Sequence, residues 1–249
     1  MHRQTDSDTP YMVVFRAFIF PIIAAGIATA IASNYQLVEN PQAVTLAVLG
    51  LVSLALGLPQ FGGDGLSFRN GRPMFAGIGF AFLAWIGLLI ARFIAVGIGG
   101  SGRNLGITFL FLLIFEAFCV QLWTFGLLFR AMVEWRTPLT ATIYTGVIFG
   151  FAAYLLYGEA QYAFVADSFT ARFAILYFVV WGILYAVIRL RAGSFMGVAL
   201  IQALQTLTVW HMLTAVEPIS MIWFYSIGIV IFAVIIWRLW PKYTSDFRI

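Results

Sequence analysis

Charged residues are scarce in this sequence. Asp, Glu, Lys and Arg together make up 10% of its 249 residues, whereas hydrophobic residues make up 62%. An average soluble domain is about half apolar and about a quarter charged, so a soluble fold of this length could not bury so much apolar surface. The composition therefore excludes a soluble enzyme and a disordered chain, and it predicts a protein solvated mostly by lipid.

Cysteine and histidine are almost absent as well. Cys119 is the single cysteine, so no internal disulfide can form, and the two histidines are His2 and His211. A zinc site normally needs three or four His, Cys or carboxylate ligands close together, and no HExxH, GxSxG or Walker-type sequence occurs. We therefore predict no metal site. We interpret the net charge of +4 as basic residues at a membrane surface, and we predict no nucleic-acid partner.

Long apolar runs are what the sequence has instead. A helix needs about 20 residues to cross a bilayer, and eight runs qualify as candidates. Their predicted bounds are Met12–Ser33, Ala43–Leu58, Met74–Ile98, Ile107–Val133, Leu139–Tyr157, Ala171–Leu190, Phe195–Leu213 and Ile219–Trp240. The predicted fold is therefore all-α, a polytopic helical bundle in one integral membrane domain over residues 1–249. Three spans lie in 1–106, and the last span with a short tail lies in 214–249.

Basic residues are divided unequally between the two sides of this bundle. Eight spans place both termini on one side, and only three of the fourteen Lys and Arg residues, Arg92, Arg103 and Arg172, fall on the other. The positive-inside rule then predicts cytoplasmic termini in a multi-pass protein of the cytoplasmic or inner membrane. The first run leaves one alternative open, a signal peptide that is cleaved near Ala30–Ser33.

Glycine and proline divide the predicted spans. Ala43–Leu58 is short, and we expect Pro59 to end it and a Gly-rich cytoplasmic loop to follow over Pro59–Pro73. Within the spans, small residues recur, as in Gly146–Gly150 and Ala199–Ala203, and such residues let helices approach closely.

Polar side chains inside the spans are the candidate functional residues, because they are costly in a membrane. The candidates for binding a ligand or a partner are Glu116, Gln121, Arg130, Gln202, Gln205, Thr206 and His211. Gln202 and Thr206 are four residues apart and share a helix face. Each candidate admits two interpretations: hydrogen bonding or ion pairing within the bundle, as between Arg130 and Glu134, or a pocket for a lipid, pigment or peptide.

The second half of the chain resembles a known family. The segments that carry the resemblance are Thr124–Ala131, Trp135–Pro138, Val147–Ala153 and Phe178–Thr206, with its Arg-Ala-Gly-Ser turn. Their order is similar to that of the CPBP family, the CAAX proteases and bacteriocin-processing enzymes also called Abi proteins, which resemble the Ras-converting endopeptidase. The resemblance covers about Ile107–Leu213, which would be a CPBP-like core.

The resemblance implies that the positions of the family's active site are present but that the catalytic residues are not. Active members carry EExxxR, FxxxH and HxxxN or HxxxD motifs, in which a glutamate is the general base and histidines position or polarise water. The matching positions in this sequence are Phe125, Gly126, Arg130, Phe149, Ala153, Gln202 and Thr206. Only Arg130 and Phe149 keep the motif residue. We therefore expect no catalytic residues and no peptidase activity.

The resulting hypothesis is a catalytically inactive CPBP-like membrane protein. It would act as an accessory, scaffold or assembly subunit for another integral membrane protein, in contact with lipids and without a cofactor. Two alternatives stay open: a divergent intramembrane metallopeptidase with a displaced active site, and a membrane binder of a lipid, quinone or pigment. In the last case His211 could ligate haem iron or a chlorophyll-type magnesium.

Overall fold

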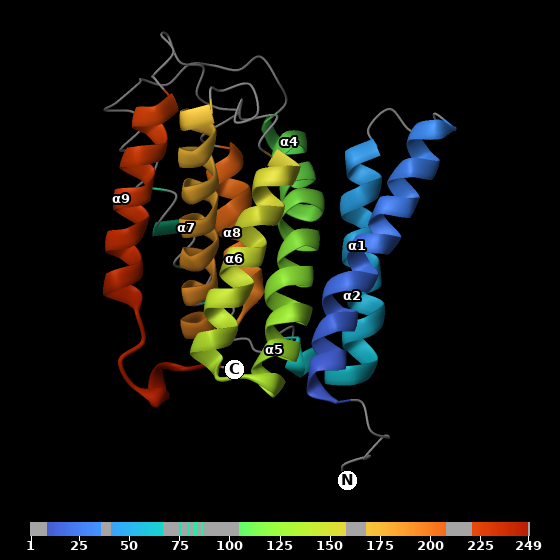
Figure 1. Cartoon of the computed structure of the whole chain (residues 1–249), viewed down its shortest axis with the longest axis horizontal. Coiled ribbons are helices and arrows are strands. Elements are labelled where there is room, and N and C mark those ends of the chain that lie inside the picture. Colours follow the sequence, from blue (N-terminus) through green and yellow to red (C-terminus); the bar gives the residue numbers. More distant parts are fainter. Residues whose placement is uncertain are drawn as a thin grey trace.

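The computed structural model describes residues 9–35, 41–66, 105–157, 168–207 and 221–248, together with a few isolated positions between 75 and 86. Across these ranges the chain is helical and forms no strand. The helices stand side by side with roughly parallel axes (Figure 1). The predicted all-α class is therefore confirmed for the described part of the chain.

The helices have the following bounds. They are α1 Pro10–Asn34, α2 Pro41–Gly65, α4 Leu105–Phe111, η1 Leu112–Cys119, η2 Leu122–Leu128, α5 Phe129–Trp135, α6 Pro138–Tyr157, α7 Ser168–Ala192, α8 Phe195–Thr206 and α9 Met221–Leu239, with a short 3₁₀ turn, η4, at Thr244–Asp246. Within the described ranges, five helical stretches are long and apolar enough to cross a membrane: Pro10–Asn34, Pro41–Gly65, Gly106–Trp135, Pro138–Leu156 and Arg172–Ala192.

Most predicted spans coincide with a helix to within a few residues. The third, Met74–Ile98, lies almost wholly outside the described residues, and so does the part of Phe195–Leu213 that follows Leu207. The count of eight spans consequently stays a prediction.

The prediction for the second span was wrong at its end. α2 passes Pro59 and is kinked at Gly62, where two helical pieces meet, and the second piece ends at Gly65, so the first part of the predicted Pro59–Pro73 loop is helical. Proline inside a helix removes one hydrogen bond and bends the axis without necessarily ending the helix. The regular backbone is interrupted only at Gly62, whose φ of 67° is accessible because glycine has no Cβ.

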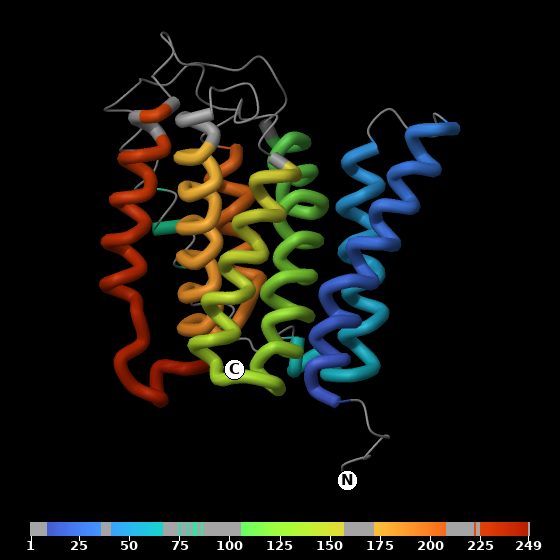
Figure 2. Tube along the Cα trace, in the orientation of Figure 1, coloured from blue at the N-terminus to red at the C-terminus, as the bar shows by residue number. Residues whose placement is uncertain are grey.

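Helices that follow one another directly in the described part of the chain run in opposite directions, as α1 and α2 do and as α6 and α7 do (Figure 1). Figure 2 shows α1 and α2 as an antiparallel pair at one side, with α2 facing the long helix that runs from α4 to α5. α6 and α7 pack along each other, α9 covers α7, and α8 packs against η1. The core lies between η1–η2, α6, α7 and α8, where most of the large buried side chains gather.

Glycines bring α6 and α7 unusually close. A Cβ atom added to Gly182 of α7 would lie 2.1 Å from the carbonyl oxygen of Gly146, and one added to Gly150 would lie 2.5 Å from the Cα of Val179. No side chain fits at such distances, so the two backbones are in direct contact. The Gly146–Gly150 pair therefore has the role that its spacing predicts.

Two stretches of the long helix from α4 to α5 are π-helical. These are η1 and η2, in which backbone hydrogen bonds run from residue i to i+5 and the turns are wider than in an α-helix. Such segments are rare and frequently occur at functional sites. All of η2 is buried, so the widened turns lie inside the bundle, next to the predicted polar residues.

Candidate functional site

Two of the predicted glutamines meet inside the bundle. Nε2 of Gln121, between η1 and η2, donates a hydrogen bond of 2.6 Å to Oε1 of Gln202 on α8. Nε2 of Gln202 donates in turn to the backbone carbonyl of Glu116, at 3.4 Å. Both glutamine side chains are buried. This chain of hydrogen bonds joins the π-helical stretch to α8.

Gln205, the third predicted glutamine, faces aromatic side chains of α7. Its Oε1 accepts a hydrogen bond of 3.1 Å from Nε1 of Trp181 and one of 2.9 Å from the hydroxyl of Tyr185. A buried indole or phenol needs an acceptor for its proton. Gln205 supplies one acceptor to both, so it has the interhelical role that the sequence allowed.

Two positions that match the family's catalytic motifs form an aromatic contact. The rings of Phe125 and Phe149 are completely buried, and their centroids lie 5.5 Å apart. The ring of Phe149 also lies 5.6 Å from Trp181 and 5.6 Å from Tyr185. Closely packed aromatic rings therefore fill the place where the resemblance puts a glutamate and the start of the FxxxH motif.

Gly126, Ala153 and Gln202, three further motif positions, are apolar or carry an amide. An added Cβ on Gly126 would contact the ring of Phe195 at 3.6 Å. Ala153 is fully buried in the same core as Phe125. With Gln202 on α8, these motif positions come from three separate parts of the chain, η2, α6 and α8.

Arg130 and Glu134 form the ion pair that their spacing of four residues predicts. Nε of Arg130 lies 3.8 Å from Oε1 of Glu134, and the two side chains are 30% and 43% exposed. A half-exposed pair of this kind contributes only about 0.3–0.5 kcal/mol. It braces the end of the helix and brings no carboxylate to the buried core.

The other predicted residues lie apart from this core. Glu116 is partly buried on η1, and its backbone carbonyl accepts the hydrogen bond from Gln202. Thr206 is half-buried at the last residue of α8. His211 lies outside the described residues, so its suggested role as a cofactor ligand stays a prediction.

One residue that the sequence analysis did not single out is Arg189. Its side chain is fully buried near the end of α7, where Nε donates to the carbonyl of Phe125 over 3.1 Å. Nη1 donates to the carbonyl of Arg248 over 3.2 Å, and the guanidinium lies 4.8 Å from the ring centre of Phe129. Arg189 thus ties α7, η2 and the C-terminal segment together.

The spacing of the aromatic residues on α7 could have predicted that Arg189 is buried. Phe178, Trp181 and Tyr185 recur every three or four residues and form the buried face of this helix. Arg189 continues the same stripe, four residues after Tyr185. As a basic residue near the end of a predicted span, Arg189 is expected at the membrane surface. Its position on the buried face of α7 predicts instead that its side chain points inward.

The turn that contributes to the family resemblance is well explained by helix capping. Gly193 has a φ of 73°, and its N–H donates to the carbonyl of Arg189 at 2.8 Å, which ends α7. Ser194 then caps α8 by accepting a hydrogen bond from the N–H of Met196 at 3.2 Å. The Arg-Ala-Gly-Ser turn thereby sets α8 beside α7 and aligns Gln205 with Trp181 and Tyr185.

The buried cluster offers hydrogen bonding rather than proton transfer. Amides, an indole and a phenol neither take up nor release a proton readily at neutral pH. Among the described residues, no three His, Cys, Asp or Glu side chains gather in a group that could hold a metal ion. This arrangement is suited to fixing the helices in one packing.

Comparison of this chain with protein-family models, with curated proteins and with solved structures finds no match in any of the three. The resemblance to the CPBP family accordingly stays a prediction from the quoted segments.

Proposed function

We propose that this chain is an eight-span, catalytically inactive CPBP-like membrane protein that binds another integral membrane protein as an accessory, scaffold or assembly subunit. The observation that carries the proposal is the buried contact of Phe125 with Phe149. These residues occupy positions where the family motifs require a glutamate and the start of FxxxH. Trp181 and Tyr185 close around Phe149, and no group in that core can act as a general base.

The directions of the helices support the proposed topology. In Figure 1, α1 begins at the lower end of the bundle, α2 returns to that end, and α9 also finishes there. α4, by contrast, begins at the upper end. An even number of crossings, with the third in the segment around Met74–Ile98, is consistent with this arrangement.

The described basic residues support cytoplasmic termini. Figure 1 places the start of α1, the region of α5 and the ends of α7 and α9 at the lower end of the bundle. The described basic residues in or next to these parts of the chain are Arg16, Arg130, Arg136, Arg189, Arg191, Arg238, Lys242 and Arg248. At the upper end, the described ranges contain Arg172 alone, near the start of α7. The positive-inside rule assigns the lower end to the cytoplasm.

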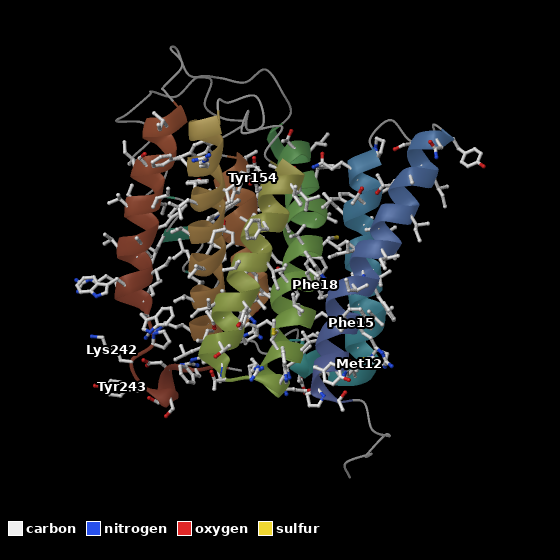
Figure 3. The ribbon with its side chains drawn as sticks, viewed as in Figure 1. Met12, Phe15, Phe18, Tyr154, Lys242 and Tyr243 are labelled. Carbon is white, nitrogen blue, oxygen red and sulfur yellow. The ribbon has the colours of Figure 1, made fainter. Side chains whose placement is uncertain are left out.

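The outer face of α1 is the surface that we propose for the partner. Ile23, Ile27 and Ile31 recur every four residues and are 53%, 57% and 48% exposed. Residues at this spacing form a ridge that packs into the groove of a neighbouring helix. The inner face of α1 is already occupied, because Phe18 stacks on Trp123, whose Nε1 donates to the carbonyl of Ala17 at 3.1 Å. Figure 3 shows Phe15 and Phe18 on the lower half of α1.

Gentle extraction from native membranes tests the proposal. The protein, tagged at its C-terminus, is purified in mild detergent, and retained proteins are measured by quantitative mass spectrometry. We expect a stoichiometric membrane partner with the natural protein and its loss with Ile23→Ala/Ile27→Ala. The matched control is Val230→Ala/Val234→Ala, which truncates two exposed residues of α9.

Two results would overturn the proposal. The first is the absence of any partner in several mild detergents, or equal loss in both double variants. The second is metal-dependent cleavage of a peptide panel by the pure protein, with stoichiometric zinc. If cleavage occurs, loss of activity in Glu116→Gln or Glu134→Gln would locate the displaced base.

A further inference from the structure

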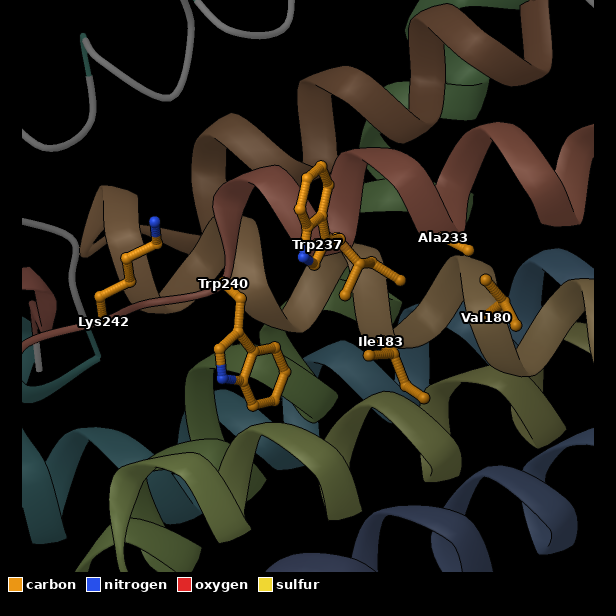
Figure 4. A pocket seen from close by; sticks show the side chains of 7 residues that line it. Val180, Ile183, Ala233, Trp237, Trp240 and Lys242 are labelled. Carbon is orange, nitrogen blue, oxygen red and sulfur yellow. The ribbon is translucent and has the colours of Figure 1, made fainter.

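A groove with a charged mouth runs between α7 and α9. Its volume is about 460 Å³, within the usual range of small-molecule sites. Its lining residues are Val180 and Ile183 from α7, Ala233, Ile236 and Trp237 from α9, and Trp240 and Lys242 from the segment that follows. Figure 4 shows Ile183 and Val180 beside Ala233, with Trp240 between them and Lys242.

The mouth of this groove carries an excess of positive charge. Lys242 lines the groove and is exposed. Arg238, in the last turn of α9, is also exposed, and its guanidinium lies 5.7 Å from the ring centre of Trp237, another lining residue. The nearest described acid is Asp246, whose carboxylate accepts hydrogen bonds from the N–H groups of Lys242 and Tyr243 at 3.0 and 3.3 Å. Arg191 lies 3.8 Å from the same carboxylate. Asp246 is therefore already engaged by Arg191 and by two backbone N–H groups.

In the topology proposed above, the groove lies at the level where the bilayer changes from hydrocarbon to headgroups. Along α9 and the segment that follows it, the lining changes from Ala233 and Ile236 to the two tryptophans and then to Lys242. Tryptophan concentrates at the headgroup level, and lysine extends toward the phosphates. Figure 3 places Lys242 and Tyr243 at the lower end of the bundle, below α9.

We propose that this groove binds an anionic glycerophospholipid of the cytoplasmic leaflet. One acyl chain lies along Val180, Ile183 and Ala233, and the phosphate pairs with Lys242 and Arg238. The order of apolar, aromatic and cationic groups matches the chemistry of that molecule from tail to headgroup. A neutral apolar ligand would gain nothing from the two cations. The inference needs the membrane placement and does not depend on the absence of catalysis or on the α1 partner surface.

Native mass spectrometry of the full chain tests this site. The protein is exchanged from nanodiscs that contain equal amounts of phosphatidylglycerol and phosphatidylcholine, and bound lipids are counted. We expect one retained phosphatidylglycerol per chain. Each basic residue near a charged membrane surface contributes about fivefold to binding, so Lys242→Ala should lower occupancy about fivefold and Lys242→Ala/Arg238→Ala about twenty-fivefold. Arg172→Ala, an exposed arginine at the opposite end of α7, is the matched control and should leave occupancy unchanged.

A second pair of variants separates the groove from general attraction to the surface. Ala233→Leu fills the apolar part and should displace the lipid, although all the charges remain. Val234→Leu enlarges an adjacent residue that is 53% exposed and does not line the groove, so it should have no effect. Equal retention of both lipids, or full occupancy in Ala233→Leu or in Lys242→Ala, would overturn the proposal.

Discussion

Gly182→Ala is the substitution for which the structure predicts the sharpest effect on stability. The new methyl group would lie 2.1 Å from the carbonyl oxygen of Gly146 and 2.9 Å from the backbone nitrogen of Gly150. Both neighbours are backbone atoms of α6, so no side-chain rotation can relieve the contact. A carbon atom approaches a carbonyl oxygen to about 3.3 Å at closest, and α6 and α7 would therefore have to separate by about 1 Å.

The energetic cost follows from that separation. A radial gap of 0.5–1 Å already forfeits roughly a quarter to a half of each dispersion contact, and overpacking a core typically costs about 1–3 kcal/mol. Because α6 and α7 would have to shift along their whole contact, we expect the upper end, about 3 kcal/mol. Alanine regains about 1 kcal/mol through its higher helix propensity. The net loss is about 2 kcal/mol, which lowers the melting temperature by roughly 4–8 °C for a chain of this size.

Thermal unfolding in one detergent, followed by intrinsic fluorescence, measures this loss. Gly26→Ala is the matched control: Gly26 is also helical, but an added Cβ would meet nothing within 4 Å. That variant should be neutral or slightly more stable, since only helix propensity changes. Equal melting temperatures for Gly182→Ala and Gly26→Ala would refute the direct backbone contact between α6 and α7.

The buried glutamine pair and the C-terminal segment give two further predictions. Gln202→Leu leaves the amide of Gln121 buried without its acceptor and should destabilise the protein by about 1–3 kcal/mol. The double variant Gln121→Leu/Gln202→Leu should cost less than the sum of the two single changes. Additive costs in a double-mutant cycle, measured by urea unfolding, would contradict the hydrogen bond between Gln121 and Gln202. The N–H of Lys242, with help from Tyr243 and Arg191, lowers the pKa of Asp246 below its ordinary value of 3.8. Its contribution to the tail conformation is therefore present above pH 3.8 and lost as the pH falls through the lowered value; a ¹³C carboxyl titration with a midpoint at or above 3.8 would contradict this.

Short-range features of the fold could be predicted from the sequence. Apolar runs located α1, α6 and α7, because a segment in lipid must satisfy its backbone hydrogen bonds internally and therefore becomes helical. The spacing of Arg130 and Glu134 predicted their ion pair, and the Gly146–Gly150 spacing predicted a close helix contact.

The end of α2 could not be located in this way. Proline does not always end a helix, and in this chain the helix passes Pro59 and is kinked only at Gly62, after which a short helical piece runs to Gly65. Leu66, just after it, is fully buried, and its side chain lies against Gly57, where an added Cβ would be 2.9 Å away. The segment after the kink therefore packs back onto α2.

The candidate site could likewise be predicted only in part from the sequence. Its polar members could be named from the sequence, but their partners could not, since Gln121 and Gln202 are 81 residues apart and Arg189 reaches the carbonyl of Phe125 from 64 residues away. Which side of an apolar helix faces inward is poorly encoded by hydropathy, because lipid tails and a protein core are equally apolar. The sequence alone determined that this protein is helical and which polar residues its apolar helices contain. Only the tertiary structure decided which faces are buried and which hydrogen-bond donors meet which acceptors, because those choices depend on packing between helices that hydropathy does not distinguish.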